Sequence, residues 1–250
     1  MVDGVLTANP VNNAAIQATY KWFRAGKAIT GGTGSTYTPT ISDYLKPITV
    51  TSTVTQTGFG TVTTTSSPVT IQAGSFTPPV IGIAGSPVMA GTVLVTATIP
   101  SGMKASYQWL RSGVAITGAT RTSYSIKADD VSKDLSIKVI FTKTGYLPAT
   151  LTSSAVAVTA GTLTKTVIPT ISGIKLVGKS LTATTGIWDS GTTFSYQWLR
   201  NGVPISGATT KSYKLVSADL GSAIGFRIIA TKPGYIPVTN FSIDTSVISY

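Results

Sequence analysis

Apolar and polar residues alternate along much of the chain. Residues 224–230 (IGFRIIA) place an apolar side chain at every second position, and residues 50–54 do so more weakly. Such alternation predicts β-strands with one buried face, because successive side chains of a strand point to opposite sides. Thr, Val, Ile and Tyr are frequent in these segments, and Gly, Asn and Pro interrupt them at short intervals. No segment carries the apolar stripe of an amphipathic helix, so we expect an all-β protein.

One segment occurs three times, as ATYKWFRAGKAITGGTGSTY, ASYQWLRSGVAITGATRTSY and SYQWLRNGVPISGATTKSY. Its Trp residues are Trp22, Trp109 and Trp198, at offsets of 87 and 89 residues. Each Trp is followed by a Tyr after 15 residues, an Asp after 21 and a Gly–aromatic pair after 36, without a gap. Chance does not keep four landmarks in register three times, so the chain is built from repeats. Asn201–Gly202 and Ser112–Gly113, inside the repeat, predict tight hairpin turns.

The copies also end in register. Gly74, Gly161 and Tyr250 each lie 16 residues after the glycine of a Gly–aromatic pair. These ends predict three domains, at residues 1–74, 75–161 and 162–250. Neither junction contains a long Gly/Ser-rich or Pro-rich spacer, so we expect a semi-rigid rod.

Each repeated Trp lies on a predicted strand, with a Tyr two residues before it and an Arg two residues after it on the same face. This is the pattern of a Trp buried between two sheets. The predicted structural core therefore consists of Trp22, Trp109, Trp198, Tyr20, Tyr107 and Tyr196. We expect the later strand with Ile224, Phe226 and Ile228 to pack against Trp198 from the facing sheet. The alternative is that the Trp residues form a row of exposed platforms for sugars.

The third copy, YQWLRNGVPISGAT followed by SYKLVSADLGSAIGFRIIATKPGY, resembles the bacterial immunoglobulin-like repeats of actinobacterial surface proteins and tailed-phage structural proteins. The resemblance covers all three units and is strongest in the third. It implies three tandem β-sandwiches of about seven strands each, without catalytic activity, that serve as spacer, surface or adhesion elements. Trp188 matches a further family position that the first two units lack.

An Asp lies 19 residues after the Arg of each copy. In immunoglobulin-like sandwiches, an Arg and an Asp of this kind can close the lower edge of the fold. We therefore predict three structural salt bridges: Arg24–Asp43, Arg111–Asp130 and Arg200–Asp219. The competing hypothesis is that these Asp residues are catalytic or bind calcium. The one acidic cluster, at residues 129–134, lacks an EF-hand pattern and contains Lys133, so we predict no metal site.

The composition narrows the chemistry. The sequence contains no Cys, His or Glu, which removes thiolate and imidazole nucleophiles and ligands, and we expect no catalytic residue and no cofactor. The net charge is +11, with isolated Lys and Arg residues. These charges either keep strand edges soluble or attract an anionic partner such as a cell-wall glycan. Nucleic acid is not expected, because the recurring aromatic residues are predicted to be buried. No apolar run is long enough for a membrane span.

The first unit is short at its beginning. Strand-like segments at residues 76–88 and 166–177 precede Leu94 and Leu181, whereas residues 1–5 alone precede the equivalent Leu6. Either the chain is cut from a longer protein, or a neighbouring subunit in an assembly donates the missing strand. With no secretion signal visible, we expect a structural or adhesion array on a phage virion, as capsid decoration or tail-attached protein. The alternative is a bacterial cell-surface or secreted stalk that binds cell-wall carbohydrate.

Overall fold

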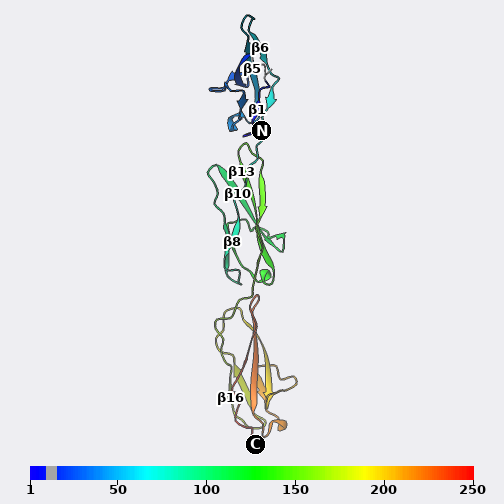
Figure 1. Ribbon diagram of the computed structural model, residues 1–250. Helices are drawn as coiled ribbons and strands as arrows, with labels where there is room; N and C mark the ends of the chain where they lie inside the picture. The colour runs from blue at the N-terminus through cyan, green and yellow to red at the C-terminus, as the bar shows by residue number, and fades with distance from the viewer. Residues whose placement is uncertain (10–15) are drawn as a thin grey trace.

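The computed structural model describes residues 1–9 and 16–250, and Figure 1 shows three β-sandwiches arranged end to end. Each sandwich has its own apolar core, running from Val2 to Ile71, from Val93 to Val158 and from Leu163 to Ile248. We call these the N-terminal, middle and C-terminal domains. The predicted all-β architecture of three tandem immunoglobulin-like sandwiches is confirmed.

The N-terminal domain has a two-stranded sheet and a larger one. The small sheet pairs β1 (Leu6–Thr7) with β4 (Thr36–Tyr37). The larger sheet has the order β3-β2-β5-β6, and β7 also pairs with β5. Its strands are β2 (Gln17–Arg24), β3 (Lys27–Ala28), β5 (Pro47–Thr55), β6 (Val62–Thr65) and β7 (Val69–Thr70). A 3-10 turn, η1 (Ile41–Asp43), precedes β5.

The middle domain repeats this plan with one more strand. Its smaller sheet has the order β8-β9-β12, and its larger sheet has the order β11-β10-β13-β14, with β15 on β13. The elements are β8 (Gly82–Gly85), β9 (Thr92–Thr96), β10 (Met103–Arg111), β11 (Val114–Ala115), β12 (Ser123–Ser125), η2 (Ala128–Asp130), β13 (Asp134–Lys143), β14 (Ala149–Thr152) and β15 (Val156–Ala157).

The C-terminal domain pairs its strands in the orders β16-β17-β20 and β19-β18-β21-β22. The elements are β16 (Thr170–Gly173), β17 (Ser180–Thr184), β18 (Thr193–Arg200), β19 (Val203–Pro204), β20 (Ser212–Lys214), η3 (Ser217–Asp219), β21 (Ile224–Thr231) and β22 (Val238–Phe241). Within the described residues, no helix is long and apolar enough to cross a membrane.

The expectation that residues 224–228 face Trp198 from the opposite sheet is wrong. β21 is hydrogen-bonded directly beside β18, with Phe226 opposite Trp198 in the register. Residues opposite each other in an antiparallel pair point to the same face, so the two rings line one inner surface together, 4.8 Å between centroids. The opposite sheet contributes Leu181 and Ala183 of β17 to the same core.

Hairpin turns form where the sequence predicts them. The φ angles of Asn201 and Gly202 are 46° and 79°. Those of Ser112 and Gly113 are 45° and 80°. Two successive left-handed residues make the type I′ turn that suits the twist of a two-residue hairpin. The N-terminal domain has Ala25 at the first position, with a φ of 42°. Ala has no side-chain group to support that conformation, so this turn is strained.

In the described residues of the N-terminal domain, β1 has no strand on its outer side. β9 and β17 are each flanked by a further strand, β8 and β16, on the side away from β12 and β20. No residue among 1–9 and 16–250 pairs with β1 in the corresponding place. The edge of β1 opposite β4 is therefore open in the described part of the domain.

Candidate functional site

The repeated Trp residues lie inside the sandwiches. Trp22, Trp109 and Trp198 are at most 3 % exposed. Each indole N–H donates to a backbone carbonyl 12 residues later, at 2.8–2.9 Å, so the buried donor is satisfied. Trp188 is also buried and donates to the Thr185 carbonyl. None of the four rings is available for stacking on a sugar, so the row of exposed platforms is not formed. Tyr20, Tyr107 and Tyr196 are half-buried and pack against the three cores.

An ion pair lies beside each Trp. The Arg side chain donates to one oxygen of the Asp carboxylate at 2.6–2.8 Å in all three domains, and every one of these Asp residues is fully buried. The structure brings together the residues of the three predicted pairs: Arg24–Asp43, Arg111–Asp130 and Arg200–Asp219. A buried carboxylate is stable only when it is paired and hydrogen-bonded. Each of the three Asp carboxylates therefore accepts hydrogen bonds from other groups besides the Arg.

A Tyr hydroxyl and a backbone amide complete each network. Tyr124 donates to the second oxygen of Asp130 at 2.9 Å, and the Lys127 amide donates to it at 2.7 Å. Tyr37 and Tyr213 do the same for Asp43 and Asp219. This role was not predicted from the sequence, although the Tyr that recurs 15 residues after each Trp was the available signal. Burial, together with the hydrogen bond to Asp130, raises the pKa of Tyr124 to about 12.

The carboxylates hold the 3-10 turns in place. Burial by itself would raise the pKa of Asp43, but hydrogen bonds from Arg24, Tyr37 and Thr40 outweigh it and keep the pKa below its usual value. The backbone amide that donates to Asp43 belongs to Thr40, which is the residue before η1. The same bond precedes η2 and η3. A carboxylate whose two oxygens both accept hydrogen bonds in this way supports the structure. It offers no free oxygen for catalysis or for calcium. Among the described residues, no group of acidic side chains is placed to bind a metal.

The Gly–Tyr pairs form the joints between domains. Gly74, where the chain leaves the N-terminal domain, donates to the Gly145 carbonyl at 2.9 Å and accepts from the Leu147 amide at 2.8 Å. Tyr146 lies over this glycine, and its hydroxyl donates to Asp3. The Lys143 ammonium lies 4.1 Å from the centre of the ring. The joint therefore combines backbone hydrogen bonds with an aromatic contact.

The second joint repeats the first. Gly161 donates to the Gly234 carbonyl at 3.0 Å and accepts from the Ile236 amide at 2.9 Å. The Lys232 ammonium lies 4.4 Å from the centre of the Tyr235 ring. Ala128, the first residue of η2, packs against Gly234, as Ile41 of η1 packs against Gly145. The ion pairs thus position the turns against which the next domain rests.

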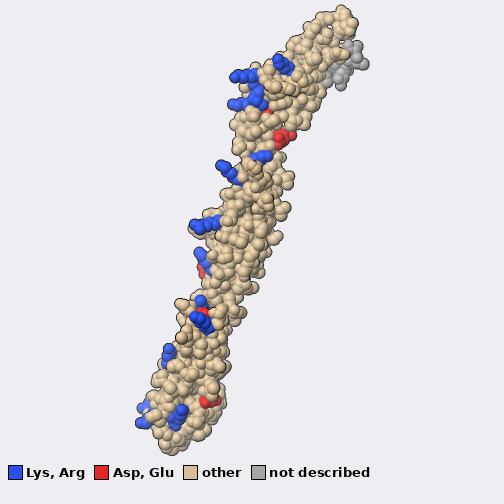
Figure 2. All heavy atoms as spheres, turned by 90° about the vertical axis from the view of Figure 1, so that its left-hand side faces the viewer, with Lys and Arg blue, Asp and Glu red and all other residues tan. Residues whose placement is uncertain are grey.

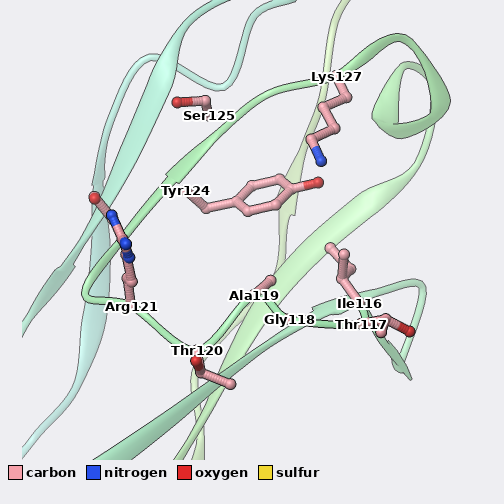
Figure 3. Close-up of a pocket in the computed structure, with 10 residues that line it drawn as sticks. Ile116, Thr117, Gly118, Ala119, Thr120, Arg121, Tyr124, Ser125 and Lys127 are labelled. Atoms are coloured by element: carbon pink, nitrogen blue, oxygen red, sulfur yellow. The ribbon is translucent and has the colours of Figure 1, made fainter.

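The surface of the middle domain has a shallow hollow of about 220 Å³ (Figure 3). It lies between strand β12 and the segment that follows β11. The side chains of Tyr124 and Lys127 point toward each other at its rim. Thr40 and Val216 take the place of Lys127 before η1 and η3, so this arrangement is not a shared property of the domains.

The charges are distributed unevenly. Three Asp and three Arg residues neutralise one another in the ion pairs, so 16 Lys and Arg residues and five Asp residues remain. Figure 2 shows the basic side chains along one long side of the molecule, over all three domains. Such a side favours contact with an extended anionic surface or polymer.

Comparison with known proteins gives structural matches alone. No protein-family model matches the sequence, and no curated protein is significantly similar to it. The fold is similar to a calcium-stabilised adhesin with which an Antarctic bacterium binds ice, at 13 % identity and a TM-score of 0.43, over 93 % of this chain and 65 % of that one. It is also similar to the three N-terminal domains of the highly immunogenic outer capsid protein of bacteriophage RB49, at 14 % identity and a TM-score of 0.31, over 98 % and 93 %. These likenesses concern the arrangement of β-domains and say nothing about the function of this chain.

Proposed function

We propose that this chain is a non-enzymatic structural rod, displayed on the surface of a phage virion as a capsid decoration or tail-attached protein. The observation that supports this role is the use of the repeated residues. Each repeated Trp is buried, and each repeated Asp accepts hydrogen bonds from an Arg, a Tyr and a backbone amide. Two of the three Gly–aromatic turns bind the neighbouring domain. The repeats therefore build and connect domains, which is the requirement for a spacer that presents a surface at a distance from its anchor.

Localisation tests this proposal. Antibodies raised against the chain would be used for immunogold electron microscopy of phage particles and of the host cells that produce them. Gold on intact virions supports display on the particle. Gold on cell walls of uninfected cells supports the alternative, a cell-surface stalk. Gold confined to the cytoplasm, with neither particles nor walls labelled, contradicts both.

The second candidate is adhesion to anionic cell-wall carbohydrate, which is favoured by the basic side of the rod in Figure 2. Binding to isolated walls should fall steeply as salt rises from about 50 to about 200 mM, because screening weakens contacts between exposed charges. Walls stripped of their anionic polymers are the matched control. Binding that is independent of salt, or equal on stripped walls, would remove this candidate.

The open edge of β1 supports a protein partner within the assembly. We propose that a neighbouring subunit adds a strand there, because β8 and β16 fill the same place in the other domains. A peptide with the sequence of residues 80–86 (VIGIAGS), taken from the β8 region, should slow amide exchange in β1 when added to the chain. A scrambled peptide is the control, and equal effects of both would contradict the proposal.

A further inference from the structure

The Gly58–Phe59 turn has the conformation of the two joint turns. The φ angles of Gly58, Gly145 and Gly234 are 83°, 81° and 80°. In each turn the amide of the aromatic residue donates to the carbonyl three residues earlier, at 3.0 Å. The turn of the N-terminal domain is therefore already folded in the form that binds a neighbouring domain in the other two copies.

Within the described residues, the groups that make the joints have no hydrogen-bond partner at this turn. In the middle domain the Gly145 carbonyl and the Leu147 amide both bond to Gly74. The corresponding groups are the Gly58 carbonyl and the Gly60 amide, and neither takes part in a hydrogen bond with any residue of 1–9 or 16–250. A Cβ built on either glycine would meet no atom within 4 Å, whereas one on Gly145 would collide with Ile41.

The turn also exposes apolar surface at the end of the rod. Phe59 is 71 % exposed and Val62 is 62 % exposed. Together with Val54, Gln56, Gly60 and Thr61 they line a hollow of about 420 Å³. Figure 1 shows the turn between β5 and β6 at the end of the N-terminal domain that points away from the middle domain. We call residues 54–62 the distal tip.

We propose that the distal tip docks end-on onto an immunoglobulin-like domain of another protein chain, and that it pairs with a glycine in the segment that leaves that domain. The two joints within this chain show the geometry. The aromatic ring of the turn covers the glycine so closely that a Cβ on Gly74 would lie 3.0 Å from Tyr146 Cδ1, and one on Gly161 would lie 2.9 Å from Tyr235 Cε1. A larger residue does not fit under the ring, so the partner segment needs glycine at this position.

The distal tip differs from the joint turns in ways that weaken the contact. Gln56 takes the place of Lys143 and Lys232, so the distal tip has no counterpart of the lysine that lies over the ring in both joints. Phe59 has no hydroxyl to repeat the bond from Tyr146 to Asp3. The docked interface is also small, and it is not helped by a covalent linker as the internal joints are. The contact is therefore reversible. It does not depend on whether the rod is displayed on a virion or on a cell.

The chain itself can provide the partner segment. Ser249 pairs with Leu176 as Thr159 pairs with Val88, so the structural counterpart of Gly161 is the position after Tyr250 and not Tyr250 itself, which the repeat spacing had aligned with it. A full chain with Tyr250→Ala and a C-terminal Gly-Thr-Leu extension thus reproduces the exit segment of the middle domain. Sedimentation velocity should show concentration-dependent head-to-tail association of this extended chain.

Three variants of the extended chain decide the outcome, each checked for an unchanged circular dichroism spectrum. Phe59→Ala, and separately Val in place of the added Gly, should weaken association by at least about tenfold, because each removes the ring–glycine contact. Phe241→Ala, which truncates another exposed aromatic residue, should leave it unchanged. The inference is overturned if the extended chain stays monomeric at the highest soluble concentration, or if Phe59→Ala associates as strongly as the parent.

Discussion

Replacing Asp130 by Asn tests the buried ion pairs most directly. The substitution keeps the shape of the side chain and removes its charge. Asp130 is fully buried and accepts from Arg111, from the Tyr124 hydroxyl and from the Lys127 amide. In Asn, an NH2 group replaces one acceptor, so two donors face each other and the Arg111 charge loses its partner. Loss of one partner of a buried pair costs 3–5 kcal/mol, and Arg111 is 29 % exposed, so we expect the lower end, about 3 kcal/mol.

Native-state hydrogen exchange measures this loss domain by domain. A cost of about 3 kcal/mol should speed the slowest amides of β10 and β13 by about a hundredfold, because about 1.4 kcal/mol corresponds to a factor of ten. The N-terminal and C-terminal domains serve as internal references. Asp129→Asn removes the same charge from an exposed neighbour and should change little. Exchange in β13 that stays within about threefold of the parent would refute the assignment of a structural role to the pair.

Further predictions concern the N-terminal domain and the joints. The pKa of Asp43 is lowered on folding, so its stabilising effect is complete above pH of about 4 and is lost as the pH falls through the folded value. The NMR signal of the Trp22 indole N–H should report this acid unfolding, and Asp43→Asn should flatten its pH dependence. Ala25→Asn should stabilise the N-terminal domain by about 0.5–1 kcal/mol, since Asn tolerates the left-handed conformation better. A higher urea midpoint for that domain is the expected readout. Gly161→Val should displace the Tyr235 turn and let the middle and C-terminal domains bend. Small-angle scattering should then show a shorter maximum dimension, while each domain keeps its own stability.

The candidate site divides into parts that the sequence predicts and parts that it does not. The pairing of Arg200 with Asp219 was predicted from the recurrence of both residues together with the resemblance to immunoglobulin-like repeats, in which such a pair closes the lower edge of the fold. The sequence shows Tyr213 as a recurring residue of the repeat. Its hydrogen bond to Asp219 depends on where the folded domain places the hydroxyl group. The contact of Gly74 with Tyr146 joins residues of two domains, and no local pattern specifies it.

Strand formation, the number of domains and the identity of the buried faces follow from the chain alone. They rest on side-chain alternation and on a repeat, and both are properties of neighbouring or regularly spaced residues. Only the tertiary structure determines which strands are neighbours. It places Phe226 beside Trp198 in the same sheet and not in the facing sheet. It also decided that Tyr146 and Tyr235 lie over linker glycines while Phe59 stays exposed. These outcomes depend on packing between residues that are distant in sequence, because a period of two identifies the buried face of a strand and leaves its neighbours undetermined.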